Sequence, residues 1–272
     1  MSNNLLGAEA SAWLALGTDL PAPCVRLVLS DVDGVITRGE GQPADLFVIE
    51  RLAAWNRAAL ADALVPAVTL CTGRQAPYVE LMAQMTEVFL PCIFEHGAGL
   101  FFPRAFRYQF DPLLGPDYSA RLARLRAALR EGGRFFVQPG KEATMTLYPL
   151  GNTTLDEVFE QASAVAADLG FDVERNVQGI EVRPHGIDKG LGLRRLLDLL
   201  ELSLDAAAGI GDSDPDLSFL ELVAFSAAPA NATDAVRSNV SCVANSAFGE
   251  GLLEILDTLA ERNRRTLTST RV

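Results

Sequence analysis

Short apolar runs, each ending at a polar residue, alternate along this chain with stretches of helical spacing. Residues 25–30 (VRLVLS) stop at Asp31, and residues 66–71 (PAVTLC) stop at Thr72. Between them, over 46–62, apolar residues recur on one face of a helix. Short apolar strands that alternate with helices predict a parallel sheet covered on both faces. We therefore expect an α/β fold with a doubly wound, Rossmann-like core.

The pattern changes in the middle of the chain and then resumes. The core pattern further predicts a helix over 75–86, a strand over 91–95, and, near the C-terminus, helices over 189–201, 215–221, 232–238 and 249–261 with strands over 206–210, 223–226 and 240–244. The middle predicts strands over 106–110, 134–138, 143–148, 171–175 and 179–183 with helices over 117–130 and 154–169. Strand pairs with two helices indicate a small α+β module. We expect a catalytic core of residues 1–103 and 185–272, with a cap inserted at 104–184.

The charge of the chain limits its partners. The 272 residues carry a formal net charge of -12, which repels nucleic acid and anionic lipid. None of the four cysteines forms a CxxC pair, and the N-terminus lacks the basic start of a secretory signal. We expect a reduced, cytoplasmic protein without a membrane or nucleic-acid partner, and leave self-association into a homodimer open.

Four polar groups follow predicted strands or begin a predicted helix, where open α/β sheets place their sites. They are Asp31 and Asp33 in DVDG, Thr72-Gly73-Arg74, Lys189, and the aspartates of Asp212-Ser213-Asp214-Pro215-Asp216. Each group alone is typical of a turn or a helix cap. A calcium loop is excluded because its glycine and glutamate positions hold Ile36 and Gln42.

In this order, the four groups resemble the motifs of the haloacid dehalogenase superfamily, over roughly 25–103 and 186–262. The resemblance implies a phosphatase in which Asp31 attacks phosphorus and forms an aspartyl-phosphate. It implies that Asp33 protonates the leaving oxygen and later activates water. Thr72 and nearby backbone N–H groups would hold phosphate oxygens, and Lys189 would neutralise charge.

Carboxylates and a phosphate need a cation between them, and Mg²⁺ suits oxygen ligands. By resemblance, Mg²⁺ would be held by the Asp31 side chain, the Asp33 backbone carbonyl and the Asp212 side chain. Many relatives carry asparagine where this chain has Pro215. Whether Asp214 or Asp216 then supports the metal is open, and we assign Asp216.

The insert lies between the second and third motifs, as in superfamily members with the larger α/β cap. EHGA at 95–98 and EVRP at 181–184 resemble segments of trehalose-phosphate phosphatases. Asn231-Ala232 resembles the broader sugar-phosphatase branch, and a cap this short also occurs in archaeal-type phosphoglycolate phosphatases. His96 we interpret as a structural residue without a catalytic role.

These similarities predict a small phosphorylated metabolite as substrate. We expect a sugar phosphate, with trehalose 6-phosphate as the first named candidate and phosphoglycolate as the second. The residues predicted to contact phosphate or substrate are Gly73, Arg74, Asn231, Lys141 and Arg183. A phosphomutase of the same superfamily and a catalytically silent binding protein are the alternatives.

Overall fold

The computed structural model describes residues 5–18, 20–130, 134–176 and 179–270, and its centre is a parallel sheet. The strands are β1 (Leu27–Ser30), β2 (Ala67–Leu70), β10 (Ala207–Ile210), β11 (Phe225–Ala228) and β12 (Cys242–Val243), in the order β12-β11-β10-β1-β2. All neighbours in this sheet run parallel. The predicted α/β class with a parallel-sheet core is confirmed.

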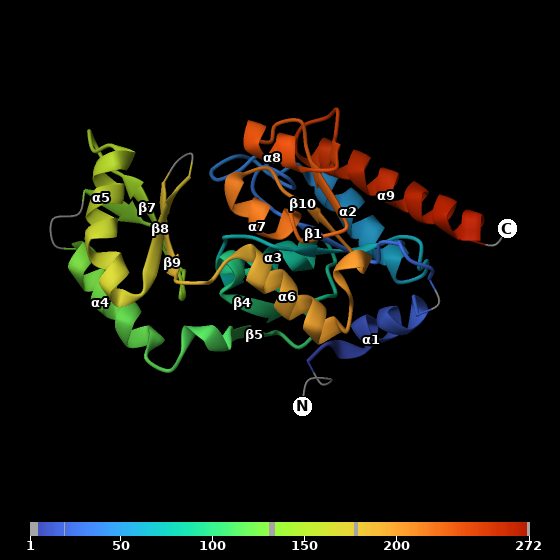
Figure 1. The fold of residues 1–272 in the computed structure, drawn as a ribbon, viewed down its shortest axis with the longest axis horizontal. Helices are drawn as coiled ribbons and strands as arrows, with labels where there is room; N and C mark the ends of the chain where they lie inside the picture. Colours follow the sequence, from blue (N-terminus) through green and yellow to red (C-terminus); the bar gives the residue numbers. More distant parts are fainter. Residues whose placement is uncertain (1–4, 19, 131–133, 177–178, 271–272) are drawn as a thin grey trace.

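Helices cover both faces of this sheet, as Figure 1 shows. They are α1 (Gly7–Leu16), α2 (Leu46–Ala59), α3 (Ala76–Met85), α6 (Lys189–Leu200), α7 (Leu217–Leu220), α8 (Asp234–Asn239) and α9 (Phe248–Thr270). Side chains alternate between faces along a strand. Leu27 and Leu29 of β1 therefore pack with Leu196 of α6, whereas Val28 packs with Leu52 of α2 and with residues of α9.

A second, antiparallel sheet extends the core. It contains β3 (Cys92–Phe94), β4 (Gly99–Phe102) and β5 (Arg107–Phe110), in that order. Cys71, just after β2, bridges in parallel to Ile93 of β3 and so joins the two sheets. The sequence did not predict β4, because four residues (GLFF) directly after a tight turn show no period. Because β5 pairs with β4, this hairpin crosses the predicted boundary at 104, and the domain limits stay a prediction.

The remaining sheet is antiparallel and carries its helices on one face only. Its strands are β6 (Phe135–Val137), β7 (Met145–Pro149), β9 (Ile180–Pro184) and β8 (Phe171–Arg175), in that spatial order, with helices α4 (Tyr118–Arg130) and α5 (Leu155–Ala166). Met145, Leu147 and Val182 point into a core with both helices. In Figure 1 the helices lie on the side away from the parallel sheet, so the other face of this sheet turns toward the core.

Two helices differ from expectation in different ways. Helix α1 was not predicted. Its buried residues are Ala10 and Trp13. The predicted helix at 215–221 is instead a 3-10 turn, η6 (Asp214–Asp216), followed by the single turn of α7. The other 3-10 turns are η2 (Glu95–Gly97), η3 (Pro112–Leu114), η4 (Ala167–Leu169) and η5 (Leu204–Ala206). No helix in the described part of the chain is both long and apolar enough to span a bilayer.

Candidate active site

The predicted site residues meet because three neighbouring strands end at the same edge of the sheet. Asp31 follows β1, Thr72 follows β2, and Asp212 lies two residues after β10, while the sheet order places β1 between the other two. They line a cavity of about 310 Å³. Its core lining also includes Asp33, Gly34, Arg38, Glu40, Gly73, Arg74, His96, Lys189 and Asn231; Gln138, Lys141, Tyr148, Asn176 and Glu181 line it from the other side.

Lys189 lies between two carboxylates at the first turn of α6. Its Nζ is 3.0 Å from Asp31 Oδ1 and 2.5 Å from Asp216 Oδ1. All three residues are buried. Burial alone would lower the pKa of Lys189, but Asp216 and Asp31 raise it. Lys189 is therefore a permanently charged ammonium beside the Asp31 carboxylate.

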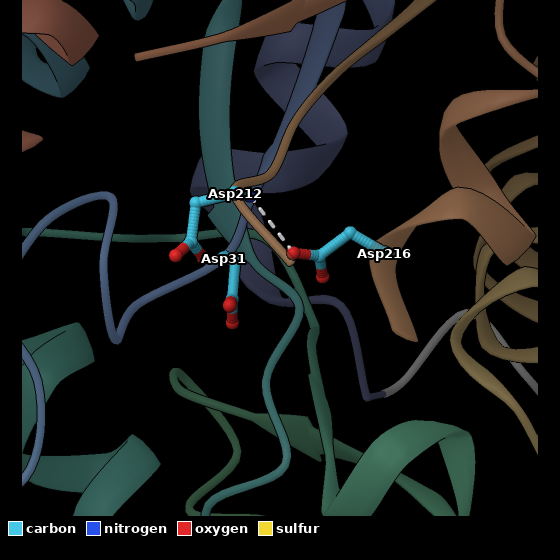
Figure 2. Close-up of side chains that lie close together, drawn as sticks. All are labelled: Asp31, Asp212 and Asp216. Carbon is cyan, nitrogen blue, oxygen red and sulfur yellow. Dashed lines mark hydrogen bonds between the residues drawn. The ribbon is translucent and has the colours of Figure 1, made fainter. Parts of the chain in front are cut away.

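Asp31, Asp212 and Asp216 form an acidic cluster, drawn in Figure 2. One carboxylate oxygen from each lies within 4.8 Å of the others. Asp216 Oδ2 accepts hydrogen bonds from the backbone N–H groups of Asp212 and Ser213, which fixes the loop after β10. The Asp214 side chain instead accepts a hydrogen bond from Thr233. The geometry thus places Asp216, rather than Asp214, in the cluster.

This cluster has the properties of a cation site. Burial raises the pKa of Asp31 to about 7 and that of Asp212 to about 8, and the neighbouring carboxylates add to both shifts. Asp212 Oδ1 is buried and has no hydrogen-bond partner among the described residues. Three carboxylates with one ammonium leave an excess of negative charge, which a divalent cation with oxygen ligands would neutralise.

Asp33 is held by Arg74. Its Oδ2 accepts a hydrogen bond from Arg74 Nε at 2.6 Å, and its Oδ1 accepts one from Nη2 at 2.8 Å. Arg74 Nη1 also lies 3.2 Å from Glu40 Oε1. Although burial opposes it, Asp33 raises the pKa of Arg74. In this arrangement, the guanidinium predicted to contact phosphate is engaged by carboxylates.

The remaining predicted core residues shape the loops. Thr72 Oγ1 accepts a hydrogen bond from the Arg74 backbone N–H at 3.2 Å. Gly73 leaves room for a ring, because a Cβ there would lie 2.3 Å from His96 Nε2. Asn231 donates from Nδ2 to the Gly34 carbonyl at 2.9 Å, and its Oδ1 accepts from the Phe248 N–H. Asn231 therefore holds the loop after β1 while lining the cavity.

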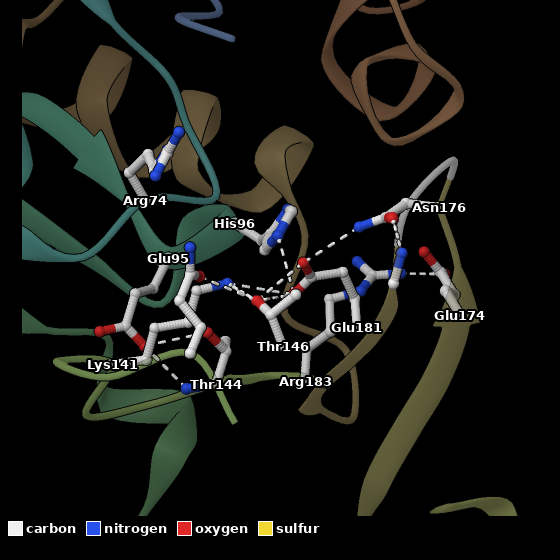
Figure 3. Close-up of polar contacts among 12 residues, drawn as sticks. Arg74, Glu95, His96, Lys141, Thr144, Thr146, Glu174, Asn176, Glu181 and Arg183 are labelled. Atoms are coloured by element: carbon white, nitrogen blue, oxygen red, sulfur yellow. Dashed lines mark hydrogen bonds and ion pairs between the residues drawn. The ribbon is translucent and has the colours of Figure 1, made fainter. Parts of the chain in front are cut away.

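Lys141, in the loop between β6 and β7, lines the cavity, and Figure 3 shows its polar contacts. Its Nζ donates to Thr146 Oγ1 and to Glu181 Oε2, the latter at 3.1 Å. Despite burial, Lys141 lowers the pKa of Glu181 to about 2. His96 Nε2 is 3.4 Å from Glu181 Oε2, and burial lowers the pKa of His96. His96 Nε2 makes no hydrogen bond to the described residues.

Arg183 is not brought to the cavity, in contrast to its predicted role. Its Nη1 donates to the Ile187 carbonyl at 3.0 Å, and Nη2 pairs with Glu174. Arg183 shares a face of β9 with Glu181, but two residues along a strand span roughly 6.8 Å. That distance places Arg183 toward the connection to α6, outside the cavity lining.

Four residues that line the cavity, Glu40, Gln138, Tyr148 and Asn176, were not predicted from the sequence. Glu40, in the loop after β1, accepts hydrogen bonds from Gln138 Nε2 at 2.6 Å and from the Tyr148 hydroxyl. Asn176 donates to Glu181 Oε1 at 3.3 Å. The period-two alternation of β7 puts Tyr148 on one face with Thr146, which is the signal that a sequence reading could have used.

The chain is similar in sequence to known hydrolases. A haloacid dehalogenase-like hydrolase family matches residues 136–256. A phosphoglycolate phosphatase from Halorubrum lacusprofundi is 30% identical over 85% of this chain and 96% of its own length. One from Natronomonas pharaonis is 27% identical over 84% of this chain and 94% of its own length.

Solved structures share the fold. A Thermoplasma acidophilum protein has a TM-score of 0.69 at 20% identity and covers 87% of this chain and 98% of its own. The sucrose-phosphatase of Synechocystis sp. PCC6803, solved with sucrose and phosphate, has a TM-score of 0.63 at 16% identity, over 87% of this chain and 98% of its own. The chain belongs to the haloacid dehalogenase-like hydrolases. Within that family it is a phosphatase.

Proposed function

We propose that this phosphatase hydrolyses the phosphate monoester of a small sugar through an aspartyl-phosphate on Asp31, with Mg²⁺ as cofactor. The observation that carries this proposal is the Asp31 carboxylate at the end of β1, 3.0 Å from Lys189 Nζ and inside the cavity. A buried carboxylate beside a fixed ammonium is suited to nucleophilic attack on an anionic phosphate, since the ammonium offsets repulsion.

Two further groups would move protons. Asp33 would protonate the leaving oxygen and then take a proton from the attacking water. In this structure both carboxylate oxygens of Asp33 accept hydrogen bonds from the Arg74 guanidinium. We therefore expect Arg74 to turn toward the phosphate when substrate enters, which would release Asp33 for proton transfer. Thr72 would hold a phosphate oxygen.

The acidic cluster fits Mg²⁺. The side chains of Asp31 and Asp212 and the backbone carbonyl of Asp33 would hold it, with Asp216 fixing the loop. The bound ion would offset the charge of the carboxylates and of the phosphate. Asp212→Ala is expected to weaken Mg²⁺ binding at least about tenfold, measured by calorimetry on the substrate-free protein. Unchanged binding would remove Asp212 from the site.

Four polar side chains of the cavity lining suit hydroxyl groups. Glu40, Gln138, Tyr148 and Asn176 offer hydrogen-bond donors and acceptors. The buried cation Lys141 is paired with Glu181, so a second negative charge on the substrate would face carboxylates. This supports a sugar phosphate, with trehalose 6-phosphate first. The names of the relatives favour phosphoglycolate as the second candidate. Nothing in the site favours a mutase, and the family match speaks against a silent binding protein.

A substrate screen would test the proposal. Phosphate release from trehalose 6-phosphate, glucose 6-phosphate and phosphoglycolate would be measured with Mg²⁺ and with excess chelator. We expect kcat/KM for a sugar phosphate to exceed that for phosphoglycolate at least about tenfold, because like charges in one cavity repel. The reverse order would make phosphoglycolate the substrate class. Full activity in chelator would rule out the metal.

A further inference from the structure

Glu95 of the core binds a row of backbone N–H groups in the loop that carries Lys141. Its Oε1 accepts from Glu142 N at 2.8 Å, and its Oε2 accepts from Ala143 N and Thr144 N, each at 2.7 Å. Thr144 Oγ1 also donates to Oε2 at 3.0 Å. Glu95 is only 1% exposed. Four donors on one buried carboxylate make a strong and directional contact.

The backbone at Glu95 is strained, and it is tied to the catalytic loop. Glu95 and His96 have φ of 45° and 58°, in the left-handed region that is unfavourable for a non-glycine residue. Glu95 N donates to the Arg74 carbonyl at 2.9 Å, and His96 N donates to the Thr72 carbonyl at 3.0 Å. Glu95 and His96 thus connect the Thr72–Arg74 loop to the 142–144 segment that Glu95 binds.

The same loop is bound from its other side by helix α4. Arg126 Nη2 donates to the Lys141 carbonyl at 2.6 Å, and the Tyr118 hydroxyl donates to the carbonyls of Glu142 and Ala143. The carbonyls are therefore held within the module of α4, whereas the N–H groups are held by the core. Loss of Glu95 would leave the loop formed but release it from the core.

We propose that Glu95 is a positioning residue that docks the 141–144 loop on the core and so holds Lys141 and Glu181 over Asp31. Lys141 lies in this loop and pairs with Glu181 of β9, so a shift of the loop would move Lys141 away from the cavity and leave Glu181 without this cation. The proposal rests on the proposed function only for its catalytic consequence. The docking contact itself exists without substrate and can be measured without turnover.

Hydrogen exchange of the substrate-free protein tests the docking. In Glu95→Gln, the side chain keeps its size but presents an amide group to the loop N–H groups. We expect the amides of 142–144 to exchange at least about tenfold faster, with α4 unchanged. Glu142→Gln is the matched control, because its exposed side chain contacts Tyr108 rather than the cavity, and it should exchange as wild type.

Kinetics test the consequence. For Glu95→Gln we expect kcat/KM on glucose 6-phosphate to fall at least about tenfold. The kcat/KM on p-nitrophenyl phosphate should fall less than about threefold, because only the sugar would contact Lys141 and Glu181. Thr144→Val removes only the Oγ1 donor to Glu95. It should lower kcat/KM on glucose 6-phosphate by a smaller factor, and it tests the proposal if Glu95→Gln does not fold.

Two outcomes would overturn the proposal. Unchanged exchange at 142–144 in folded Glu95→Gln, or in Thr144→Val where Glu95→Gln does not fold, would show that Glu95 does not dock the loop. Equal losses on both esters would show general damage to the site. A wild-type protein that releases no phosphate from any ester would instead refute the proposed function, and the exchange result would still decide the role of Glu95.

Discussion

Asp31 and Lys189 show how one buried pair can set the reactivity of a site. The carboxylate is 5% exposed and the lysine 3% exposed, so little water screens their attraction. Asp216 shares the same ammonium and keeps it in place. The lysine thereby stays charged in a site that would otherwise favour its neutral form, and Asp31 has a fixed cation beside its Oδ1.

The first prediction concerns Asp31 as the proposed nucleophile. Asp31→Asn preserves the shape of the side chain but removes the charge and the attacking oxygen, so kcat should fall at least about a thousandfold. Phosphate release under saturating substrate and Mg²⁺ would measure the loss. As a control, Asp257→Asn changes an exposed residue of α9 and should retain wild-type turnover. A tenth of the wild-type rate in Asp31→Asn would refute covalent catalysis by Asp31.

At the scale of elements, the loop after β1 must pass very close to the loop after β10. Gly34 has φ of 88°, and a Cβ there would lie 2.1 Å from Asp212 Oδ2. Gly39, in the same loop, has φ of 107°, but a Cβ there would meet nothing within 4 Å among the described residues. An alanine at either glycine would strain the backbone, but only an alanine at Gly34 would also contact the acidic cluster.

The second prediction uses this pair. Gly34→Ala should displace the Asp212 carboxylate and weaken Mg²⁺ binding at least about tenfold, whereas Gly39→Ala should carry only the left-handed backbone cost of roughly 1–2 kcal/mol. Calorimetric titration with Mg²⁺ would measure the first effect, and urea unfolding the second. Equal Mg²⁺ affinity in the two variants would argue against the acidic cluster as the metal site.

The third prediction concerns the attachment of α9. Asn263 is fully buried; its Oδ1 accepts from Val25 N, and its Nδ2 donates to the carbonyls of Val25 and Leu64. Asn263→Ala leaves these backbone groups unpaired and should lower the free energy of unfolding by about 2 to 4 kcal/mol. Asn239→Ala removes an exposed hydrogen bond and should change it by less than about 0.5 kcal/mol. Urea unfolding would measure both, and similar values would contradict the inferred role of Asn263.

At the scale of the whole molecule, the raised pKa values of Asp31 and Asp212 make both folding stability and Mg²⁺ binding depend on pH. Without metal, the folded protein holds protons on Asp31 and Asp212 more tightly than the unfolded chain does, because their pKa values rise from 3.8 to about 7 and about 8. The stability from this binding is present below about pH 4 and is lost as pH rises through 7 to 8. Mg²⁺ requires the ionised carboxylates, so it competes with these protons.

The fourth prediction follows. The increase in Tm caused by Mg²⁺ should be larger at pH 8 than at pH 6, since at pH 6 the ion must displace protons that the folded protein holds. Thermal unfolding of chelator-treated protein with and without Mg²⁺, at both pH values, would measure this. Asp212→Asn removes one of the two groups and should reduce the difference. An equal or larger increase at pH 6 would contradict the prediction.

The sequence by itself determined the parallel-sheet core and the polar residues at its edge. Short strands end at Asp31 and Thr72, and this pattern is local, so it can be read from periodicity and composition. Strand β4 was missed because GLFF shows no hydrophobic period. Its partner β5 lies beyond the expected domain boundary at 104. The meeting of Asp31, Thr72 and Asp212 followed from the rule that parallel strands share a carboxyl edge.

Only the tertiary structure decided which side chains face one another across the cavity. Arg74 pairs with Asp33, Glu40 reaches Tyr148, and Arg183 turns to Glu174; none of these contacts follows from residue type or spacing. Glu95 is the clearest case, because its partners lie 47 to 49 residues away. Contacts between distant segments depend on how whole elements pack, and a local pattern carries no information about that packing.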